Sequence, residues 1–524
     1  MKKKIFFGLL LGLILYPANK VTNYNISNIN YNEGNEISNQ IEVEWQKNWG
    51  GNNDDYFESI IETQDGYVVV GYTESSDIEG LTNKGDSDAI IIKYDKNGNI
   101  IWQKNYGGSD SDHFNSIIET QDGYIVIGES DSTSIEGLTN KGDSDAIIVK
   151  YDKNGNIMWQ NNYGGNDYDN FKSIIETQDG YVVVGRTFSN DIEGLTYPLN
   201  YEAIIIKYDK NGNIIWQRGY EGNVDSFISI IETQDGYVVV GGTLSSYIEG
   251  SDFTGDDNAI IIKYDKNGNI LWQKIYGGKY YDNFVSIIET QDGYVVVGET
   301  ESTDIEGLTY KGVHDAIIIK YDKNGNIVWQ RNWGGKYYDN FESIIETQDG
   351  YVVVGETRST DIEGLTSKGL DDAIIVKYDK NGNKIWQRNW GGNKNDYFES
   401  IIKTQDGYVV IGETESSDIE GLTNKGSRDI IIVKYKLVNT IDTSNNNEVL
   451  DSNSENSNDN VSTENISNNS STNNTNTNQE TVVDAPNTLS FISKILLIAS
   501  GLLIIFGIGL YGYNLYKLNK QNNK

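Results

Sequence analysis

Short runs of β-branched and aromatic residues, separated by polar turn residues, fill the chain between Ile41 and Tyr435. One unit, read from Phe57, holds four runs: Ser59–Thr63, Tyr67–Thr73, Asp88–Tyr94 and Ile100–Tyr106. Clusters of Asn, Asp and Gly bound each run and no helical periodicity is present, so the pattern predicts β-strands. The middle runs, such as Val-Val-Val and Ile-Ile-Ile, do not alternate with polar residues. That pattern is typical of sheets packed on both faces.

The unit recurs with an almost constant period. The tryptophan that closes it is spaced by 57 residues in five intervals and by 56 in one. A fixed period of this size indicates stacked supersecondary units. Four strands per unit and seven units predict an all-β, seven-bladed β-propeller of four-stranded blades. The seven tryptophans are Trp45, Trp102, Trp159, Trp216, Trp272, Trp329 and Trp386.

The two ends of the array predict how the ring closes. The array begins with an unpaired fourth strand, Ile41–Trp49, and ends with an unpaired third strand, Asp429–Tyr435. Pairing the first strand with the last completes the seventh blade and removes the exposed sheet edges. The propeller is therefore expected to span residues 41–436.

The repeat resembles a family of secreted and cell-surface bacterial seven-bladed propellers. The similarity lies in Gly85–Gly108 (GDSDAIIIKYDKNGNIIWQKNYGG), the acidic residues that follow it and Gln121–Gly128 (QDGYIVIG). The resemblance covers roughly Ile41–Tyr435 and implies a secreted binding scaffold without a single established activity.

The segments outside the array predict a cell-surface protein. Residues 1–20 combine Lys2, Lys3 and Lys4 with a short apolar run, the pattern of a secretory signal peptide. Residues 491–513 are apolar and long enough for one transmembrane helix. Lysines in residues 514–524 predict a basic cytoplasmic tail, so the N-terminal body is expected outside the cell.

Residues 437–490 are rich in Asn, Ser, Thr and Glu with almost no aromatic residues, which predicts a disordered stalk. The stalk ends in Ala485-Pro486-Asn487-Thr488-Leu489. This pentapeptide weakly resembles a Gram-positive sortase sorting signal, with Pro486 and Thr488 matching the family motif and Ala485 and Leu489 departing from it. Membrane anchoring is the primary interpretation and cell-wall attachment the alternative.

The composition excludes several functions. The 77 acidic and 42 basic residues give a net charge of -35, which argues against nucleic-acid binding. The absence of cysteine excludes disulfides and thiolate metal sites. His113 and His314 are the only histidines, and no Gly-x-Ser-x-Gly elbow occurs. The sequence therefore offers few residues from which a hydrolase active site could be built. The sequence does not fit a sialidase Asp-box, because Asp95 stands three residues before Gly98 rather than two.

The recurring Asp95-Lys96-Asn97-Gly98-Asn99 stretch allows two interpretations. Alternating oxygen-bearing side chains around a glycine are compatible with a small calcium loop, but no terminal bidentate acid follows. Asn-Gly between two β-branched runs is a strong hairpin signal. We expect a turn without a metal or other cofactor and keep calcium as the alternative.

The loops predict where ligands bind. Successive loops of a blade alternate between the two faces of the ring, so the Gly-Gly loops and the long loops should share one acidic, variable face. Three loops that depart from the repeat fall together at the boundary of blades three and four. Because exposed aromatic residues are preferred binding anchors, we expect a ligand-binding patch there, formed by Tyr197, Tyr201, Tyr220, Tyr247 and Phe253.

These features favour a monomeric, non-enzymatic binding or adhesion head that recognises an extracellular glycan or protein through its acidic loop face. Two alternatives remain: a carbohydrate-active enzyme that uses carboxylates on that face, and a calcium-stabilised structural spacer.

Overall fold

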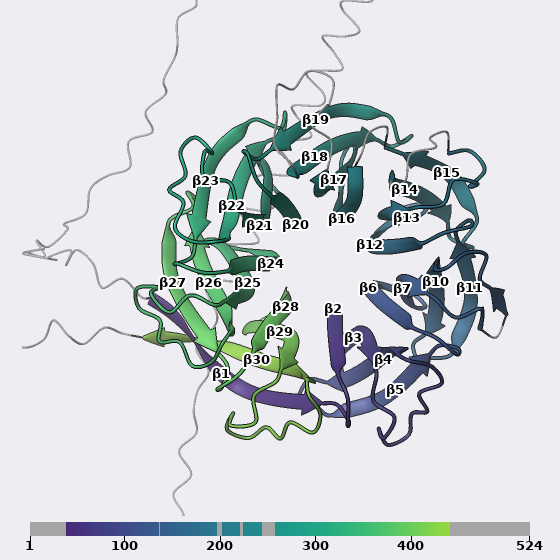
Figure 1. The fold of residues 1–524 in the computed structure, drawn as a ribbon, viewed down its shortest axis with the longest axis horizontal. Helices are drawn as coiled ribbons and strands as arrows, with labels where there is room; N and C mark the ends of the chain where they lie inside the picture. Colours follow the sequence, from purple (N-terminus) through teal and green to yellow (C-terminus); the bar gives the residue numbers. More distant parts are fainter. Residues whose placement is uncertain (1–37, 136, 196–201, 221–223, 244–256, 441–524) are drawn as a thin grey trace, which may run out of the picture. The chain divides into compact units, whose positions relative to one another are not determined.

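The computed structural model describes residues 38–135, 137–195, 202–220, 224–243 and 257–440. Seven four-stranded antiparallel sheets are arranged as the blades of a ring, so the predicted seven-bladed propeller is confirmed (Figure 1). One additional two-stranded hairpin, β8 (Ser134–Ile135) and β9 (Leu138–Thr139), lies in the long loop of blade two.

The first two strands of each blade lie nearest the ring axis, as Figure 1 shows. The innermost strands are β2 (Asp55–Thr63), β6 (Asp112–Thr120), β12 (Asp169–Thr177), β16 (Val224–Thr233), β20 (Asp282–Thr290), β24 (Asp339–Thr347) and β28 (Asp396–Lys403). The second strands are β3 (Gly66–Thr73), β7 (Gly123–Ser130), β13 (Gly180–Thr187), β17 (Gly236–Thr243), β21 (Gly293–Thr300), β25 (Gly350–Thr357) and β29 (Gly407–Thr414).

The other two strands of each blade lie farther from the axis. The third strands are β4 (Asp88–Asp95), β10 (Asp145–Asp152), β14 (Glu202–Asp209), β18 (Asn258–Asp265), β22 (Asp315–Asp322), β26 (Asp372–Asp379) and β30 (Asp429–Thr440). The outer strands are β5 (Ile100–Tyr106), β11 (Ile157–Tyr163), β15 (Ile214–Gly219), β19 (Ile270–Tyr276), β23 (Ile327–Trp333), β27 (Lys384–Trp390) and β1 (Ser38–Trp49).

The innermost strand is longer than the sequence pattern indicates. In blade one it begins at Asp55 rather than at Ser59, because a β-bulge at Glu58 interrupts the pairing between Phe57 and Ser59. Two residues of a bulged strand oppose one partner residue, so the inward and outward positions change places at that point. The simple alternation of the strand is therefore lost in the sequence.

The core lies between blades, where the middle strands are buried on both faces. In blade one, Val68, Val70, Ala89 and Ile91 pack against residues of blade two, while Val69, Ile90 and Ile92 pack toward blade seven. This arrangement explains the unbroken Val-Val-Val and Ile-Ile-Ile runs. Burial of each such side chain contributes about 1.5–3 kcal/mol.

The first strand of the array closes the ring. Strand β1 pairs with β30, with Val43 opposite Tyr435 and Trp45 opposite Lys434. The register shifts between Val43 and Trp45, as it does at the equivalent place in the six other blades. The predicted closure is confirmed. Pairing continues to Ser38 and Thr440, so Leu437–Thr440 extend a strand rather than beginning a stalk.

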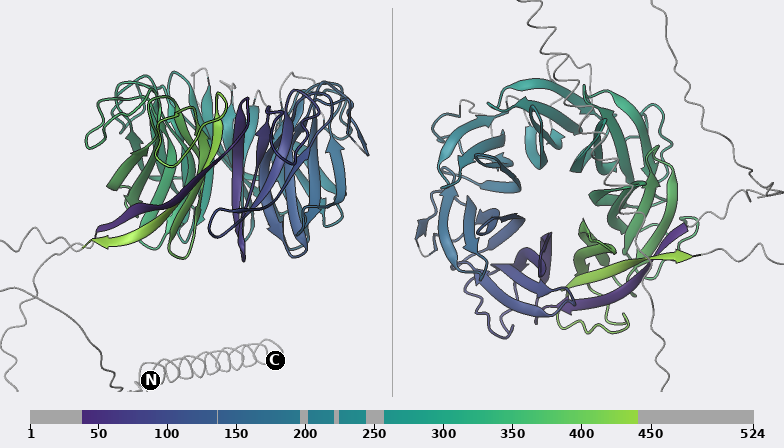
Figure 2. Two further views of the ribbon diagram at one scale, coloured as in Figure 1. Left: turned by 90° about the horizontal axis from the view of Figure 1, so that it is seen from below. Right: turned by 180° about the vertical axis from the view of Figure 1, so that it is seen from behind.

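The two faces of the ring carry different loops (Figure 2). The Gly-Gly loops and the long loops contact each other: the Asn52 amide, for example, donates to the Asp77 carboxylate over 2.8 Å. On the opposite side, Lys93 of one turn region pairs with Asp65 of the other over 2.8 Å. We call the first side the loop face and the second the turn face.

The Asn-Gly stretch is a turn, as expected. The Asp95 Oδ1 atom accepts hydrogen bonds from the backbone amides of Asn97 (2.9 Å) and Asn99 (2.8 Å). Gly98 has φ +75°, a left-handed conformation that favours glycine. Donation from these amides holds the pKa of the Asp95 carboxyl below its usual value. The carboxylate therefore caps its own turn.

Several sequence predictions lie outside the described residues. These are the signal peptide (1–20), the stalk beyond Thr440, the C-terminal transmembrane helix (491–513) and the basic tail (514–524). Within the described ranges, no helix is both long and apolar enough to cross a bilayer.

Candidate functional site

The blades differ from one another chiefly at the loop-face ends of their two innermost strands. Buried positions there are uniform: Phe57 and its six counterparts are all phenylalanine, and Gly71 and its counterparts are all glycine. The positions between them vary. In blade one these are Asp54 just before β2, Tyr56 on β2, Tyr72 on β3 and Glu74 just after β3.

We name these positions the variable rim, and include the residue just before each third strand. Its described members are Asp54, Tyr56, Tyr72, Glu74, Ser87, Ser111, His113, Glu129, Asp131, Ser144, Tyr168, Asn170, Arg186, Phe188, Ser226, Gly242, Asp257, Tyr281, Asn283, Glu299, Glu301, His314, Tyr338, Asn340, Glu356, Arg358, Asp371, Asn395, Tyr397, Glu413, Glu415 and Arg428.

A buried aspartate holds the rim in place in blades one, two, three, five, six and seven. In blade six, Asp339 is fully buried and accepts hydrogen bonds from the Gly335 amide (2.8 Å), the Ser359 hydroxyl (2.8 Å) and the Thr357 hydroxyl. These bonds join the Gly-Gly loop to the end of the second strand. Burial raises the pKa of the Asp339 carboxyl to about 6, although the hydrogen bonds oppose this shift. The rim therefore stands on a rigid base.

An aromatic and cationic stack spans blades seven, one and two. Tyr72 lies between Tyr56 and His113, with ring centroids 4.5 Å and 3.9 Å away. The Arg428 guanidinium stands 5.1 Å from the Tyr56 ring and 5.2 Å from the Tyr397 ring. Planar side chains packed in this way present rigid contact surfaces at low entropic cost.

A second cluster joins blades five and six around His314. Its Nδ1 lies 3.0 Å from a Glu299 oxygen and its Nε2 lies 2.6 Å from a Glu301 oxygen. Burial lowers the pKa of His314, but the two carboxylates more than offset this effect and raise it overall. The imidazole ring is also packed near Tyr338, with centroids 4.4 Å apart.

Blade six continues this cluster with an arginine. Arg358 forms a bidentate pair with the buried Asp371, through Nε at 2.6 Å and a terminal nitrogen at 2.8 Å. The guanidinium lies 5.3 Å from the Tyr338 ring. The Tyr397 hydroxyl of blade seven donates to the same carboxylate over 3.1 Å. Arg358 keeps 52% of its side chain exposed, so it can still contact a ligand.

Blade three contributes a different arrangement. The Arg186 guanidinium lies between the Tyr168 and Phe188 rings, 5.4 Å and 5.3 Å from their centroids. The Tyr168 hydroxyl donates to Glu129 over 2.6 Å. Burial raises the pKa of Glu129, but hydrogen bonding to His113 and the charge of Lys172 lower it overall to about 2, so this carboxylate is ionised.

Blade four has small residues where the other blades are bulky. Ser226 and Gly242 stand where blade one has Tyr56 and Tyr72. Among the described residues, the rim side chains at these two positions are therefore smaller in blade four than in the other blades.

The binding patch expected from the sequence includes one described residue, Tyr220. Tyr197, Tyr201, Tyr247 and Phe253 fall outside the described residues. Tyr220 is described and is not an exposed anchor: it is 3% exposed, packs in a core cluster and donates to Gln273 over 2.9 Å. It occupies the aromatic position before the loop that holds Trp49, Tyr106 and Tyr163 in other blades. Because the same position is aromatic in the other repeats, the sequence already indicated that Tyr220 would be buried like them.

Glutamates of the innermost strands gather in blades six, seven and one. Glu58, Glu342 and Glu399 occupy the bulge position, where the other four blades have Asn115, Lys172, Ile228 and Val285. Burial and the charge of Glu299 raise the pKa of Glu342 to about 7. Burial and neighbouring carboxylates also raise the pKa of Glu399 and of Glu413.

Carboxyl groups with raised pKa values can hold protons near neutral pH, or become ionised when a cationic group binds beside them. No group of three or more His, Cys, Asp or Glu side chains in the described part of the chain is placed to hold a metal ion.

Sequence reasoning did not find the variable rim. The sequence does contain the necessary pattern. When the seven units are aligned, positions that never change stand next to positions that differ from blade to blade, in the same two strands. Its meaning depended on knowing that these strands lie nearest the axis, and the repeat pattern does not contain that information.

Comparison with known proteins gives distant similarity only. No family model matches the chain. The chain is 23% identical over 341 residues to the regulatory protein FlaEY of Caulobacter vibrioides, covering 53% of this chain and 36% of that protein. It is 21% identical over 491 residues to an uncharacterised WD repeat-containing protein, L264, of Acanthamoeba polyphaga mimivirus, covering 70% of this chain and 35% of that protein. The chain thus spans about a third of the length of these relatives.

Two solved structures also show weak similarity. The WD40 propeller domain of Doa1 has a TM-score of 0.42 at 11% identity, covering 75% of this chain and 97% of that domain. A 6-phosphogluconolactonase-like protein from Bacteroides uniformis has a TM-score of 0.36 at 9% identity, covering 62% of this chain and 82% of its own.

Proposed function

We propose that the protein is a non-enzymatic binding module that recognises an extracellular glycan or protein through the variable rim of its loop face. The observation that carries the proposal is the concentration of blade-specific aromatic and charged residues at one end of otherwise uniform strands. Packing alone explains the uniform positions, while binding residues are expected on loops and strand ends held by a rigid scaffold.

The chemistry of the rim suits such a ligand. Tyr338 is 44% exposed and Arg358 is half exposed, and tyrosine and arginine are the residue types that most often anchor interfaces. The rim also carries carboxylates: Glu301 pairs with His314, and Glu415 pairs with Arg428. The ligand therefore has hydrogen-bond donors and acceptors as well as an apolar face, as saccharides and protein surfaces do.

We further propose that the propeller is a monomeric head at the cell surface. Residues 1–20 then direct export, residues 441–490 supply the stalk, and residues 491–513 hold the chain in the membrane. In this arrangement the rim is free to meet ligands outside the cell.

A binding screen tests the proposal. The purified full-length protein in detergent is applied to arrayed glycans and extracellular matrix proteins, and intact cells producing it are applied to the same arrays. We expect at least one class of ligand to retain both the purified protein and the cells. Retention of neither contradicts the binding function, and retention of the purified protein alone contradicts the surface location. Hydrolysis of an arrayed glycan would instead favour the carbohydrate-active alternative.

A further inference from the structure

On the turn face, six tryptophans of the outer strands are covered by a glycine of the next blade. A Cβ added to that glycine would lie 2.7–3.1 Å from the nearest tryptophan ring atom, so only glycine fits this close approach. The pairs are Gly98 on Trp45, Gly155 on Trp102, Gly212 on Trp159, Gly268 on Trp216, Gly325 on Trp272, and Gly382 on Trp329.

Among the described residues, no glycine covers the seventh tryptophan, Trp386, in this way. Its covering turn would belong to blade seven, where the Asn-Gly turn is absent. The chain instead continues as β30, with Leu437 in the place of Lys96. Ring closure by β1 therefore leaves the turn face different at the boundary of blades six and seven.

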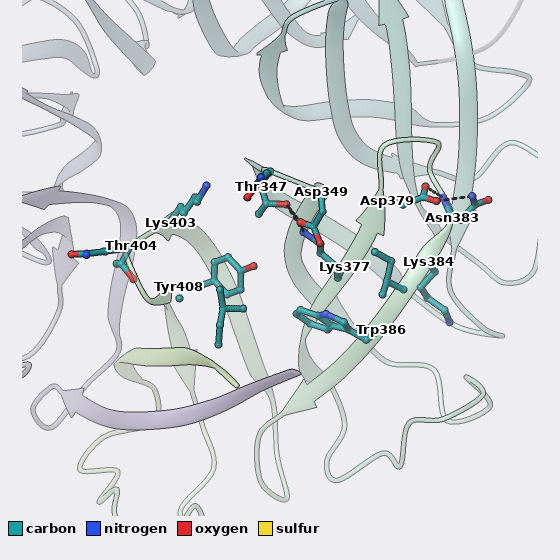
Figure 3. A pocket seen from close by; sticks show the side chains of 15 residues that line it. Thr347, Asp349, Lys377, Asp379, Asn383, Lys384, Trp386, Lys403, Thr404 and Tyr408 are labelled. Carbon is teal, nitrogen blue, oxygen red and sulfur yellow. Dashed lines mark hydrogen bonds and ion pairs between the residues drawn. The ribbon is translucent and has the colours of Figure 1, made fainter. Parts of the chain in front are cut away.

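A pocket of about 780 Å³ lies at this boundary. Trp386, Lys377 and Lys384 line it from blade six, and Lys403, Tyr408 and Leu437 line it from blade seven (Figure 3). Its volume lies in the range of small-molecule sites, which combine apolar walls with a few polar groups.

Two charged positions of this pocket differ from those of the other blades. In blades one to six, a glutamate near the end of the innermost strand pairs with the lysine of the adjacent turn, as Glu346 does with Lys380. Blade seven has Lys403 in place of that glutamate and Leu437 in place of that lysine. Within the described residues, the ammonium of Lys403 forms no ion pair.

The other lysines of the pocket have partners. Lys377 pairs with Asp349 over 2.7 Å, and Lys384, which stands where the other Asn-Gly hairpins have isoleucine, donates to Gln387 over 2.5 Å. Lys403 is therefore the lysine left to meet an anion beside Trp386, in a chain whose net charge is -35.

We propose that this pocket binds an anionic saccharide, a sugar ring that carries a carboxylate or phosphate group. The ring lies against Trp386, and the acidic group pairs with Lys403. An aromatic wall with an adjacent cation supplies both the apolar and the electrostatic contact for such a ligand. This site lies on the turn face and is independent of the variable rim.

The next boundary provides an internal comparison. A hollow of about 980 Å³ between blades seven and one is lined by Trp45 and Tyr67, the counterparts of Trp386 and Tyr408. There, however, Gly98 covers the tryptophan and Glu62 pairs with Lys96 over 2.6 Å. The same backbone arrangement thus offers an anion no unpaired lysine at that position.

Calorimetric titration with matched probes tests the proposal. The full-length protein is titrated with sialyllactose against lactose, and with a glucose phosphate against glucose. We expect at least one anionic probe to bind at least about tenfold more tightly than its neutral counterpart. The two pairs distinguish a carboxylate from a phosphate as the recognised group. Absence of binding by both anionic probes, or equal binding of the neutral sugars, overturns the proposal.

Variants locate the site. Lys403→Glu restores the residue that the other six blades carry, so it is compatible with the fold, and we expect it to weaken anion binding at least about tenfold. The control is Lys104→Glu, an exposed lysine on the outer strand of blade one with the same change in charge. Unchanged affinity in Lys403→Glu, or an equal loss in Lys104→Glu, overturns the assignment.

Discussion

Buried aspartates at the loop-face ends of blades one, three, five, six and seven are the residues that most strongly link the stability of this fold to pH. Asp55, Asp169, Asp282, Asp339 and Asp396 are fully buried, and burial raises the pKa of each carboxyl from 3.8 to about 6 against the effect of its hydrogen bonds. Between pH 3.8 and about 6, these carboxyls are therefore protonated in the folded protein and ionised in the unfolded chain.

Stability is accordingly expected to fall as pH rises. A carboxyl with a raised pKa contributes its full stabilisation below the unfolded value of 3.8 and loses it as pH passes through about 6. Each shift corresponds to roughly 3 kcal/mol. Melting temperatures followed by circular dichroism at pH 4.5 and 7.5 should be clearly higher at pH 4.5. High salt in both samples screens exposed charges and leaves the buried contribution. Equal melting temperatures, or a higher value at pH 7.5, would contradict this account.

At the scale of the element, the Asn-Gly turn of each of blades one to six packs on a tryptophan of the preceding blade. Gly325 has φ +76°, and a Cβ at this position would meet the Trp272 ring at 2.9 Å. Gly421, in a long loop, has φ +79° but would place its Cβ in open space. The two glycines share the backbone requirement and differ only in the contact.

Replacing each glycine by alanine separates these two effects. Gly421→Ala is expected to cost about 1–2 kcal/mol, the penalty for a left-handed residue with a Cβ. Gly325→Ala should cost about 1–3 kcal/mol more, because the tryptophan must shift. Urea denaturation measures both values. An equal loss of stability in the two variants would show that the turn does not depend on its contact with the tryptophan.

The sequence predicted most elements but not all their ends. Turn residues and β-branched runs located the second, third and outer strands of blade one to within one residue, whereas β1 and β30 continue beyond the predicted strands to Ser38 and Thr440. The innermost strand was shortened by four residues, because the bulge at Glu58 breaks the alternation that marks a strand. Tyr220 was placed on the surface because its loop departs from the repeat, although its own position is aromatic in every unit.

At the scale of the whole molecule, closure of the ring gives a repetitive chain two distinct faces and one distinct boundary. The period of 57 residues and the unpaired end strands were sufficient to predict seven blades and their closure. The variable rim could not be predicted, because it depends on which strands lie at the axis. The pocket beside Trp386 could not be predicted either, because it arises where β30 replaces a turn.

The account places ligand recognition on the loop face, where blade-specific residues surround the axis. Tyr338 is a suitable probe, because it is 44% exposed and belongs to the rim cluster of blades five and six. Ile101, 51% exposed on an outer strand, is a matched control away from the rim.

The most direct test is the affinity of Tyr338→Ala and Ile101→Ala for the ligand that the binding screen returns, measured by surface plasmon resonance. The account predicts a loss of at least about tenfold, or 1.4 kcal/mol, for Tyr338→Ala and no change for Ile101→Ala. Undiminished affinity in Tyr338→Ala, with melting temperatures equal to that of the unmodified protein, would contradict the assignment of the loop face as the binding surface.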